Sequence, residues 1–413
     1  MRENSASLRK AARDAILYTK EGAEMDKKVV GFIIRRERMR RDWSQDGLCR
    51  GICAASYLSK IEQGRVEASE DILRLLYERL ELPWYGGEGA LPALSERIDE
   101  LYEQVYSGEF EALSEELSAL APQRDALLQS PAAPDIAVLE AAANWRGGTD
   151  AGVDAGMEQH LSPRGLALLR LMQDRDAEAA AIYPSALCSY WAGVTQYESG
   201  RSYTAAVENL QRAYSLAAGE GRARLMMLSR AYIGNCYCNQ LDVENMEAHY
   251  TVAERLATAL HDAGMLASIR YNRAATALET GDYESAYKYF SALEEPTAMA
   301  LHKLAICCEK LGRRDEAFSA LDRADAVEDT HMPAGLAEEM LSLVRRRLEN
   351  PDYLRDADYG AALLDCFERC RRELPIGYAG FHLPWLLEWY TANRQYKLAY
   401  ELMNEFPIKL KIR

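Results

Sequence analysis

The sequence lacks the features by which membrane and exported proteins are usually recognised. No apolar run among its 413 residues is long enough to span a bilayer. Near the N-terminus, Arg2, Arg9, Lys10, Arg13 and Asp14 interrupt any apolar core of the kind that a signal peptide requires. We therefore expect a cytoplasmic protein that has no membrane partner.

Cysteine and histidine are also sparse, and neither forms a recognisable site. The nine cysteines follow no disulfide framework, so we expect reduced thiols. Cys236-x-Cys238 and Cys366-x3-Cys370 have spacings that occur in metal and redox sites. Because no histidine and cysteine cluster completes a four-ligand set, we interpret these cysteines as small buried hydrophobic side chains. The six histidines accompany no serine or cysteine motif, so the sequence indicates no enzyme, no metal and no cofactor.

Charge is distributed unevenly along the chain. The formal net charge of the whole sequence is -15, yet residues 27–65 contain ten basic and four acidic side chains. That segment therefore carries +6 and the remainder carries -21. A basic segment on an acidic body is typical of a protein that binds nucleic acid with one part and repels it with the rest. A solvated arginine face without a ligand is the alternative.

The segment 44–64 predicts two short helices joined by a tight turn. Ser44 is a suitable N-cap for the first helix, which we expect to end near Ile52–Cys53. The second helix begins at Ala55 or Ser56, and Gly64 is placed to end it with a positive φ.

Flanking residues complete a small helical bundle. One apolar stripe predicts a preceding helix over residues 29–41, and another predicts a following helix over residues 69–80. Glu62 lies among basic residues, where an unpaired carboxylate near phosphates is costly. We therefore expect Glu62 to be an internal partner of Arg38 rather than a reader of bases.

These residues resemble the helix-turn-helix of the phage-repressor (XRE-like) family. The match covers about residues 28–82 and is carried by Arg38, Ser44-Gln45, Leu48, Ser59-Lys60-Ile61-Glu62 and Gly64. The turn between Leu48 and Ser59 is one residue shorter than the common pattern, with Cys-Ala-Ala where a glycine turn is usual. The resemblance implies a DNA-binding domain over residues 26–82, preceded by an N-terminal extension, 1–25, that matches nothing.

The same resemblance implies which side chains contact double-stranded DNA. Gln45 and the N-terminus of its helix would hold a phosphate, while Ser56, Tyr57 and Lys60 would face base edges or the adjacent backbone. For Tyr57 the alternative is packing beside its own helix. The expected DNA-binding residues are Arg38, Ser44, Gln45, Ala55, Ser56, Tyr57, Ser59, Lys60 and Arg65.

Beyond a linker at residues 83–92, rich in proline and glycine, residues 93–413 predict a helical repeat. A small residue in a first helix, a Gly-Asp-Tyr-like turn and a second helix with small and aromatic positions recur together. One marker position falls at residues 206, 246, 286 and 317, in steps of 40, 40 and 31 residues. These steps bracket the period of about 34 residues that tetratricopeptide repeats have. The expected fold is all-α: an XRE-like bundle followed by a right-handed tetratricopeptide-repeat superhelix.

In such arrays the first helices line a concave face. Aromatic walls with spaced asparagines suit an extended peptide, because a carboxamide both donates to and accepts from a backbone amide. Ordinary solvated asparagines are the alternative. The expected peptide-binding residues are Tyr197, Tyr232, Asn235, Asn239, Tyr271, Asn272, Glu279 and Lys303.

A repressor-like helix-turn-helix followed by tetratricopeptide repeats resembles the peptide-pheromone-sensing regulators of Gram-positive bacteria, the Rap/Rgg/NprR/PlcR/PrgX group. The resemblance implies a cytoplasmic homodimer in which an imported short signalling peptide binds the concave face. Peptide binding would change the spacing of the two DNA-binding heads. The alternatives are a tetratricopeptide scaffold for protein interactions and a modulator of phosphorelay proteins.

Overall fold

The computed structural model describes residues 27–85, 90–145, 153, 155–199, 203–327 and 332–406. All regular secondary structure in these ranges is helical, which confirms the all-α fold class. The expected N-terminal extension, residues 1–25, lies outside the described residues. Within the described ranges, every helix is too short or too polar to cross a membrane.

Contacts divide the chain into two compact units, Met1–Cys188 and Ser189–Arg413. The residues expected to form a linker, 83–92, fall inside the first unit, and a helix already begins at Ala90. The first unit contains α2 (Lys27–Arg40), α3 (Gln45–Cys49), α4 (Ala55–Glu62), α5 (Glu70–Arg79), α6 (Ala90–Ser107), α7 (Phe110–Leu120), the 3-10 helix η1 (Ala121–Gln123), α8 (Arg124–Leu128), α9 (Ala133–Trp145), α10 (Ala155–Glu158), α11 (Pro163–Met172) and α12 (Asp176–Ile182).

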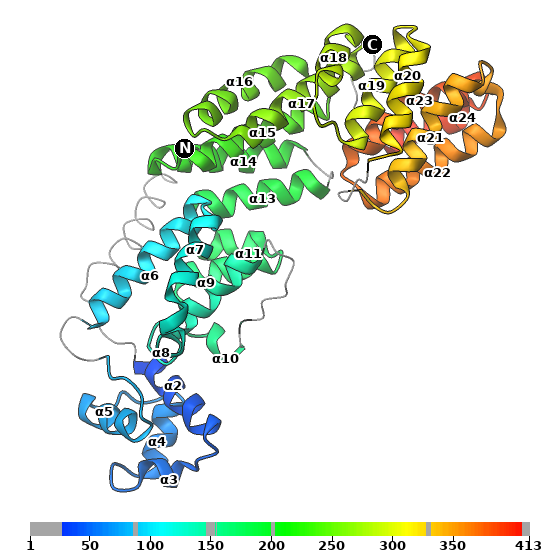
Figure 1. Ribbon diagram of the computed structural model, residues 1–413. Coiled ribbons are helices and arrows are strands. Elements are labelled where there is room, and N and C mark those ends of the chain that lie inside the picture. The colour runs from blue at the N-terminus through cyan, green and yellow to red at the C-terminus, as the bar shows by residue number, and fades with distance from the viewer. Residues whose placement is uncertain are drawn as a thin grey trace, which may run out of the picture. The chain divides into compact units, whose positions relative to one another are not determined.

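The second unit begins within α13 (Ala186–Ser199) and consists of helical hairpins (Figure 1). Its further helices are α14 (Tyr203–Glu220), α15 (Ala223–Cys238), α16 (Val243–Ala259), α17 (Ala263–Thr280), α18 (Tyr283–Ser291), α19 (Ala298–Lys310), α20 (Arg314–Ala324), α21 (Leu336–Glu349), the 3-10 helix η2 (Tyr353–Arg355), α22 (Ala357–Glu373), α23 (Ile376–Ala392) and α24 (Tyr396–Glu405).

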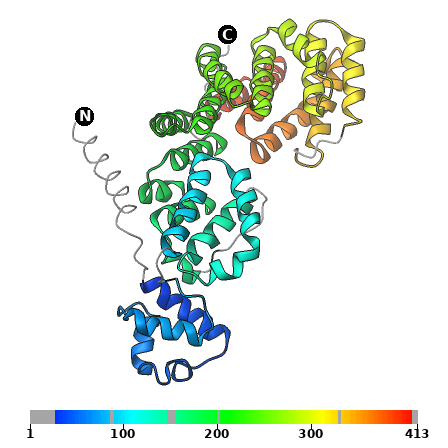
Figure 2. The same ribbon diagram turned by 60° about the vertical axis from the view of Figure 1, so that its left-hand side comes forward.

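Helices α2 to α5 form a small bundle, called the head below (Figure 2). Its core contains the fully buried side chains of Val30, Ile33, Leu48 and Leu58, which come from α2, α3 and α4. Helices α2 and α4 approach so closely at Gly31 that a Cβ atom there would lie 2.1 Å from the carbonyl oxygen of Ile61. Only glycine fits at that crossing.

The turn of the helix-turn-helix differs from the sequence-based expectation. Helix α3 ends at Cys49 and not near Ile52–Cys53. The reason is Gly51, whose φ of 76° is left-handed, a conformation that glycine adopts without strain. The turn therefore does contain a glycine, at residue 51, although Cys-Ala-Ala stands where a glycine turn is usual. The other boundaries are confirmed: Ser44 Oγ accepts the Gly47 N–H at 3.0 Å, and Gly64 has a φ of 65°.

One turn design joins successive helices of the second unit. A residue with positive φ, Leu241, His261 or Gly281, is followed by an aspartate that caps the next helix. These turns lie 20 residues apart, because helices α14 to α17 are 16 to 18 residues long. Two helices therefore repeat every 40 residues, which explains the long steps in the sequence.

Close contact between paired helices depends on small residues at the crossing. A Cβ atom added to Gly234 of α15 would lie 2.4 Å from the Tyr250 ring of α16, and one added to Gly193 would lie 2.6 Å from Leu210. These contacts confirm the small-residue and large-residue positions of the predicted repeat. Tyr250 and Leu210 are fully buried in consequence.

Candidate DNA-binding head and candidate peptide-binding face

A buried carboxylate, Glu62, holds three helices of the head together. The guanidinium of Arg38 donates from Nε to Oε1 at 2.6 Å and from Nη2 to Oε2 at 2.9 Å. Gln45, at the start of α3, donates from Nε2 to the same Oε2 at 2.8 Å. The hydrogen bonds to Glu62 raise the pKa of Arg38. The expected pairing of Arg38 with Glu62 is confirmed, and it fixes α3 and α4 relative to α2.

A second buried carboxylate, Glu37, binds part of the basic segment. Arg36 Nε and Arg41 Nη1 donate to it at 3.3 and 2.8 Å, and Arg40 lies 3.7 Å away. Arg36 also donates to the carbonyl of Leu128 in α8, which ties the head to the helices that follow. Several of the arginines that suggested a DNA-binding surface are therefore engaged within the protein.

The remaining cations and the outer face of α4 contribute to the exposed surface of the head. Among the expected DNA-binding residues, those exposed to solvent are Ser44, Ser56, Lys60 and Arg65. Those that are only half-buried are Arg38, Gln45, Ala55, Tyr57 and Ser59. Tyr57 packs against the core of the head, in agreement with the alternative that this side chain packs beside its own helix. Ser59 accepts a hydrogen bond from Gln63 at 3.1 Å. Ser56 and Lys60 are thus the two side chains of α4 that are most available to a groove.

In the second unit, Asn239 joins the first of two polar clusters. Its Nδ2 donates to the hydroxyls of Tyr203 at 2.9 Å and of Tyr197 at 3.3 Å. The Tyr197 and Tyr203 rings stack with their centres 5.8 Å apart, and Tyr232 meets Tyr197 edge-on at 5.5 Å. Burial raises the pKa of both Tyr197 and Tyr203. These hydroxyls therefore remain protonated at neutral pH.

The second polar cluster joins three successive helices, α15, α16 and α17. Asn235 Oδ1 accepts from the Tyr250 hydroxyl at 2.6 Å and from Asn272 Nδ2 at 3.1 Å. Asn272 Nδ2 also donates to the Tyr250 hydroxyl oxygen at 3.2 Å. Among the hydrogen bonds of the described residues, Asn235 Nδ2 and Asn272 Oδ1 have no protein partner. The pair therefore presents one free donor and one free acceptor.

Charged residues of the expected face lie further along the array. Glu279 is exposed to solvent, yet the protein around it raises the pKa of its carboxyl group, and the positive charges of Lys303 and His382 only partly oppose this. Tyr271, by contrast, packs edge-on against Phe290 with ring centres 5.6 Å apart.

Helix α23 packs against two members of the expected face. A Cβ atom added to Gly377, at its start, would lie 2.7 Å from Asn239 Oδ1. Lys303 Nζ lies 4.3 Å from the centre of the Phe381 ring, one helical turn further on, in cation–π geometry. Helix α23 therefore covers part of the surface that the sequence assigned to a peptide.

Sequence reasoning missed Tyr203, Tyr250 and Thr276 as members of these clusters. Tyr250 donates to Asn235, and the Thr276 hydroxyl lies 3.0 Å from Cys238 Sγ. Burial raises the pKa of Cys238 to about 11. A signal was present for Tyr203 and Tyr250, because both begin or interrupt an otherwise apolar second-helix stripe with a hydroxyl that needs a partner.

The chain shows little similarity to known proteins. Neither protein-family models nor curated proteins give a match. A solved structure of Bacillus thuringiensis PlcR, in complex with the peptide PapR7 and DNA, is similar over 59% of this chain and 99% of that chain. The identity is 13% and the TM-score is 0.30, values too low to carry details of function from PlcR to this chain.

Proposed function

We propose that the chain is a sequence-specific DNA-binding transcriptional regulator whose repeat domain binds a short signalling peptide that modulates DNA binding. In this proposal it acts as a cytoplasmic homodimer. The observation that carries the DNA-binding part is the Glu62 cluster. Its hydrogen bonds fix the buried side of α4, and the opposite, exposed side of α4 bears Ser56 and Lys60. A rigid, short helix with exposed polar side chains and flanking cations suits the major groove.

Each exposed residue of the expected contact set has a chemical role in this proposal. Lys60 donates to guanine O6 and N7 or to a phosphate, and Ser56 donates to or accepts from a base edge. Arg65, just beyond α4, and Ser44, at the start of α3, lie where the DNA backbone passes a helix-turn-helix. Arg38 and Gln45 act through Glu62, by holding α3 and α4 in position.

Selection of DNA from a random library by the full chain, followed by fluorescence anisotropy, tests the DNA-binding part. We expect Lys60→Ala to weaken binding of the selected DNA by about 5- to 150-fold, the range of a lost base contact of about 1–3 kcal/mol. Lys288→Ala, on the exposed surface of α18, is the matched control and should leave affinity unchanged. If no sequence is enriched, the proposal fails. Unchanged affinity in Lys60→Ala would remove only that residue from the contact set.

The peptide part of the proposal rests on the joined asparagines. Asn235 and Asn272 share one internal hydrogen bond, and together they leave Asn235 Nδ2 and Asn272 Oδ1 for a ligand. One donor and one acceptor side by side match the C=O and N–H of an extended peptide backbone. The two residues therefore form a single clamp that recognises the backbone and not a particular side chain.

Peptides that co-purify with the chain from its native cells, identified by mass spectrometry, provide the probe for this clamp. We expect Asn235→Ala combined with Asn272→Ala to abolish the effect of such a peptide on DNA binding while DNA affinity without peptide stays intact. Asn404→Ala, on the exposed face of α24, is the matched control. A full peptide response in the double variant would rule out the clamp, and circular dichroism confirms that the repeats remain folded.

A further inference from the structure

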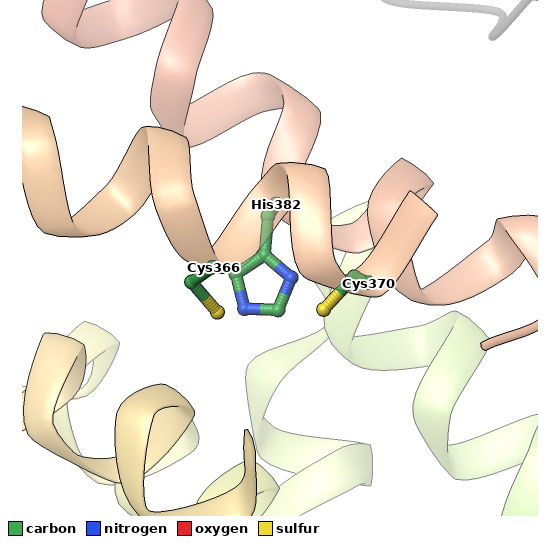
Figure 3. A group of neighbouring side chains, drawn as sticks. All are labelled: Cys366, Cys370 and His382. Atoms are coloured by element: carbon green, nitrogen blue, oxygen red, sulfur yellow. The ribbon is translucent and has the colours of Figure 1, made fainter. Parts of the chain in front are cut away.

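Three buried side chains with metal-binding atoms meet between α22 and α23. Cys366 and Cys370 lie four residues apart and so share one face of α22, and His382 lies on α23. One ligand atom from each lies within 4.8 Å of the other two, and all three residues are 0% exposed. Both sulfur atoms point toward the imidazole (Figure 3). The described ranges contain no other such group of three.

A backbone carbonyl fixes the tautomer of the histidine. Its Nδ1 lies 2.9 Å from the carbonyl oxygen of Tyr378, and because a carbonyl only accepts, Nδ1 must carry the proton. In the neutral ring Nε2 then has a free lone pair, and this atom is buried without a hydrogen-bond partner among the described residues. Metal-binding histidines are typically held in this way, by a carbonyl on the far nitrogen. A buried acceptor left unused costs about 1–3 kcal/mol.

The surroundings of the cluster select the charge of the ion. The rings of Phe381 and Trp385 lie 5.3 and 5.5 Å from the imidazole centre, and the cationic groups of Lys303 and Arg347 lie 4.3 and 4.2 Å from the centres of those two rings. Two thiolates and a neutral imidazole carry a charge of -2, which a divalent cation cancels, whereas a monovalent one leaves a buried charge that is costly. Among divalent cations, zinc combines a preference for cysteine and histidine with freedom from redox chemistry.

Other cysteine pairs of the second unit show what this cluster has in addition. Cys236 and Cys238, and Cys307 and Cys308, are also close in sequence and buried or half-buried. Among the described residues neither pair is grouped with an imidazole, and both pairs fit the interpretation of small hydrophobic side chains. Cys366 and Cys370 are the pair to which the described residues add a third donor.

We propose that Cys366, Cys370 and His382 bind one zinc ion, which fixes α22 to α23. Binding replaces the proton of each thiol, which leaves to solvent. A structural zinc site takes four donors. His302 of α19 is the adjacent candidate for the fourth, because its Nε2 is also buried without a partner and its ring centre lies 6.5 Å from that of His382. This inference does not depend on the proposed function.

The test uses the full chain, untagged and fully reduced, equilibrated with zinc and then dialysed. We expect one zinc per chain by elemental analysis, and a thiolate-to-cobalt charge-transfer band when cobalt replaces zinc. Cys370→Ser and His382→Phe should weaken zinc binding, measured against a chromophoric chelator, by more than the 10- to 100-fold that changes outside the ligand set cause. Cys307→Ala removes an equally buried thiol and should bind zinc as the unchanged chain does.

Several outcomes would overturn the zinc site. They are a reduced chain that retains no zinc, a cobalt complex without the thiolate band, and Cys370→Ser binding as tightly as Cys307→Ala. A Cys366–Cys370 disulfide in place of zinc would likewise overturn it. Mass spectrometry of protein purified without reductant would detect this disulfide, which would have to persist with zinc present. Circular dichroism checks the fold of each variant. If a variant does not fold, the stoichiometry and the cobalt spectrum of the unchanged chain decide.

Discussion

The head and the expected peptide-binding face of the second unit use their polar side chains in opposite ways. This face, called the repeat face below, contains Asn235, Asn239 and Asn272. In the head, Glu62 and Glu37 are almost fully buried and bind arginines, so the framework under α4 consists of charge pairs. On the repeat face, Asn235, Asn239 and Asn272 form neutral hydrogen bonds with tyrosines and with each other. A neutral hydrogen bond contributes about 0.5–1.5 kcal/mol net, whereas one to a charged group contributes about 1.5–3 kcal/mol.

This difference suits two different tasks. A buried ion pair resists exchange, because separating it leaves a charge without a partner in an apolar environment. Amides and hydroxyls exchange one neutral partner for another at small net cost, and a peptide backbone offers such partners. The charge pairs of the head therefore favour one fixed shape, whereas the neutral hydrogen bonds around Asn235 are compatible with the peptide exchange that we propose.

Removing the central carboxylate of the head should have the largest effect. Glu62→Ala leaves Arg38 charged, with its side chain only 12% exposed, and also removes the partner of Gln45. We expect a loss of about 3–5 kcal/mol in the stability of the head, as for other broken buried pairs. Hydrogen exchange of amides in the head, monitored during urea unfolding, measures this loss of stability.

Glu78→Ala on α5 is the control for that change, since Glu78 is exposed in the same bundle. It should alter stability by less than about 0.5 kcal/mol. A comparable loss in both variants would show that the head is sensitive to any change of charge, and the contrast between the two regions would no longer hold.

Two glycine substitutions compare the packing of the regions. In Gly31→Ala the new Cβ meets a backbone carbonyl, at Ile61, which cannot move without shifting α4. In Gly234→Ala it meets the ring of Tyr250, a side chain. Overpacking costs about 1–3 kcal/mol, and we expect Gly31→Ala at or above the upper end and Gly234→Ala below it. Equal losses in thermal or urea unfolding would contradict this order.

Much of the architecture could be predicted because its signals are local. Ser44 and Gly64 mark helix ends through their own chemistry, and the repeat shows as periodicity along the chain. Helix α3 was predicted three or four residues too long because the apolar Ile52 continues its stripe past Gly51, the glycine of left-handed φ that follows the end of the helix.

The sites were less predictable because their members come from distant parts of the chain. The predicted groove residues include Asn239, but not its partner Tyr203, which is 36 residues away. No residue pattern indicated that α23 would pack against Asn239 and Lys303. In the cysteine cluster, Cys366 and Cys370 were visible as a pair, whereas His382 joins them only after the turn between α22 and α23.

The smallest predicted effect concerns the charge on the repeat face. The pKa of Glu279 is raised in the folded chain, because surrounding protein disfavours its ionised form more than Lys303 and His382 favour it. A carboxyl with a raised folded pKa stabilises the fold only at low pH, and this contribution is lost as pH rises through the folded pKa. Glu279→Gln should therefore raise the free energy of unfolding at pH 7 by less than about 1 kcal/mol, since the residue is solvent-exposed and its interactions are screened. In urea unfolding the gain should vanish near pH 4, below the unfolded pKa of about 4.3.

Glu294→Gln, in an exposed turn, is the control and should show no such gain. A loss of stability at pH 7 in Glu279→Gln would mean that attraction to Lys303 outweighs burial, and the repeat face would then resemble the head in depending on a charge pair.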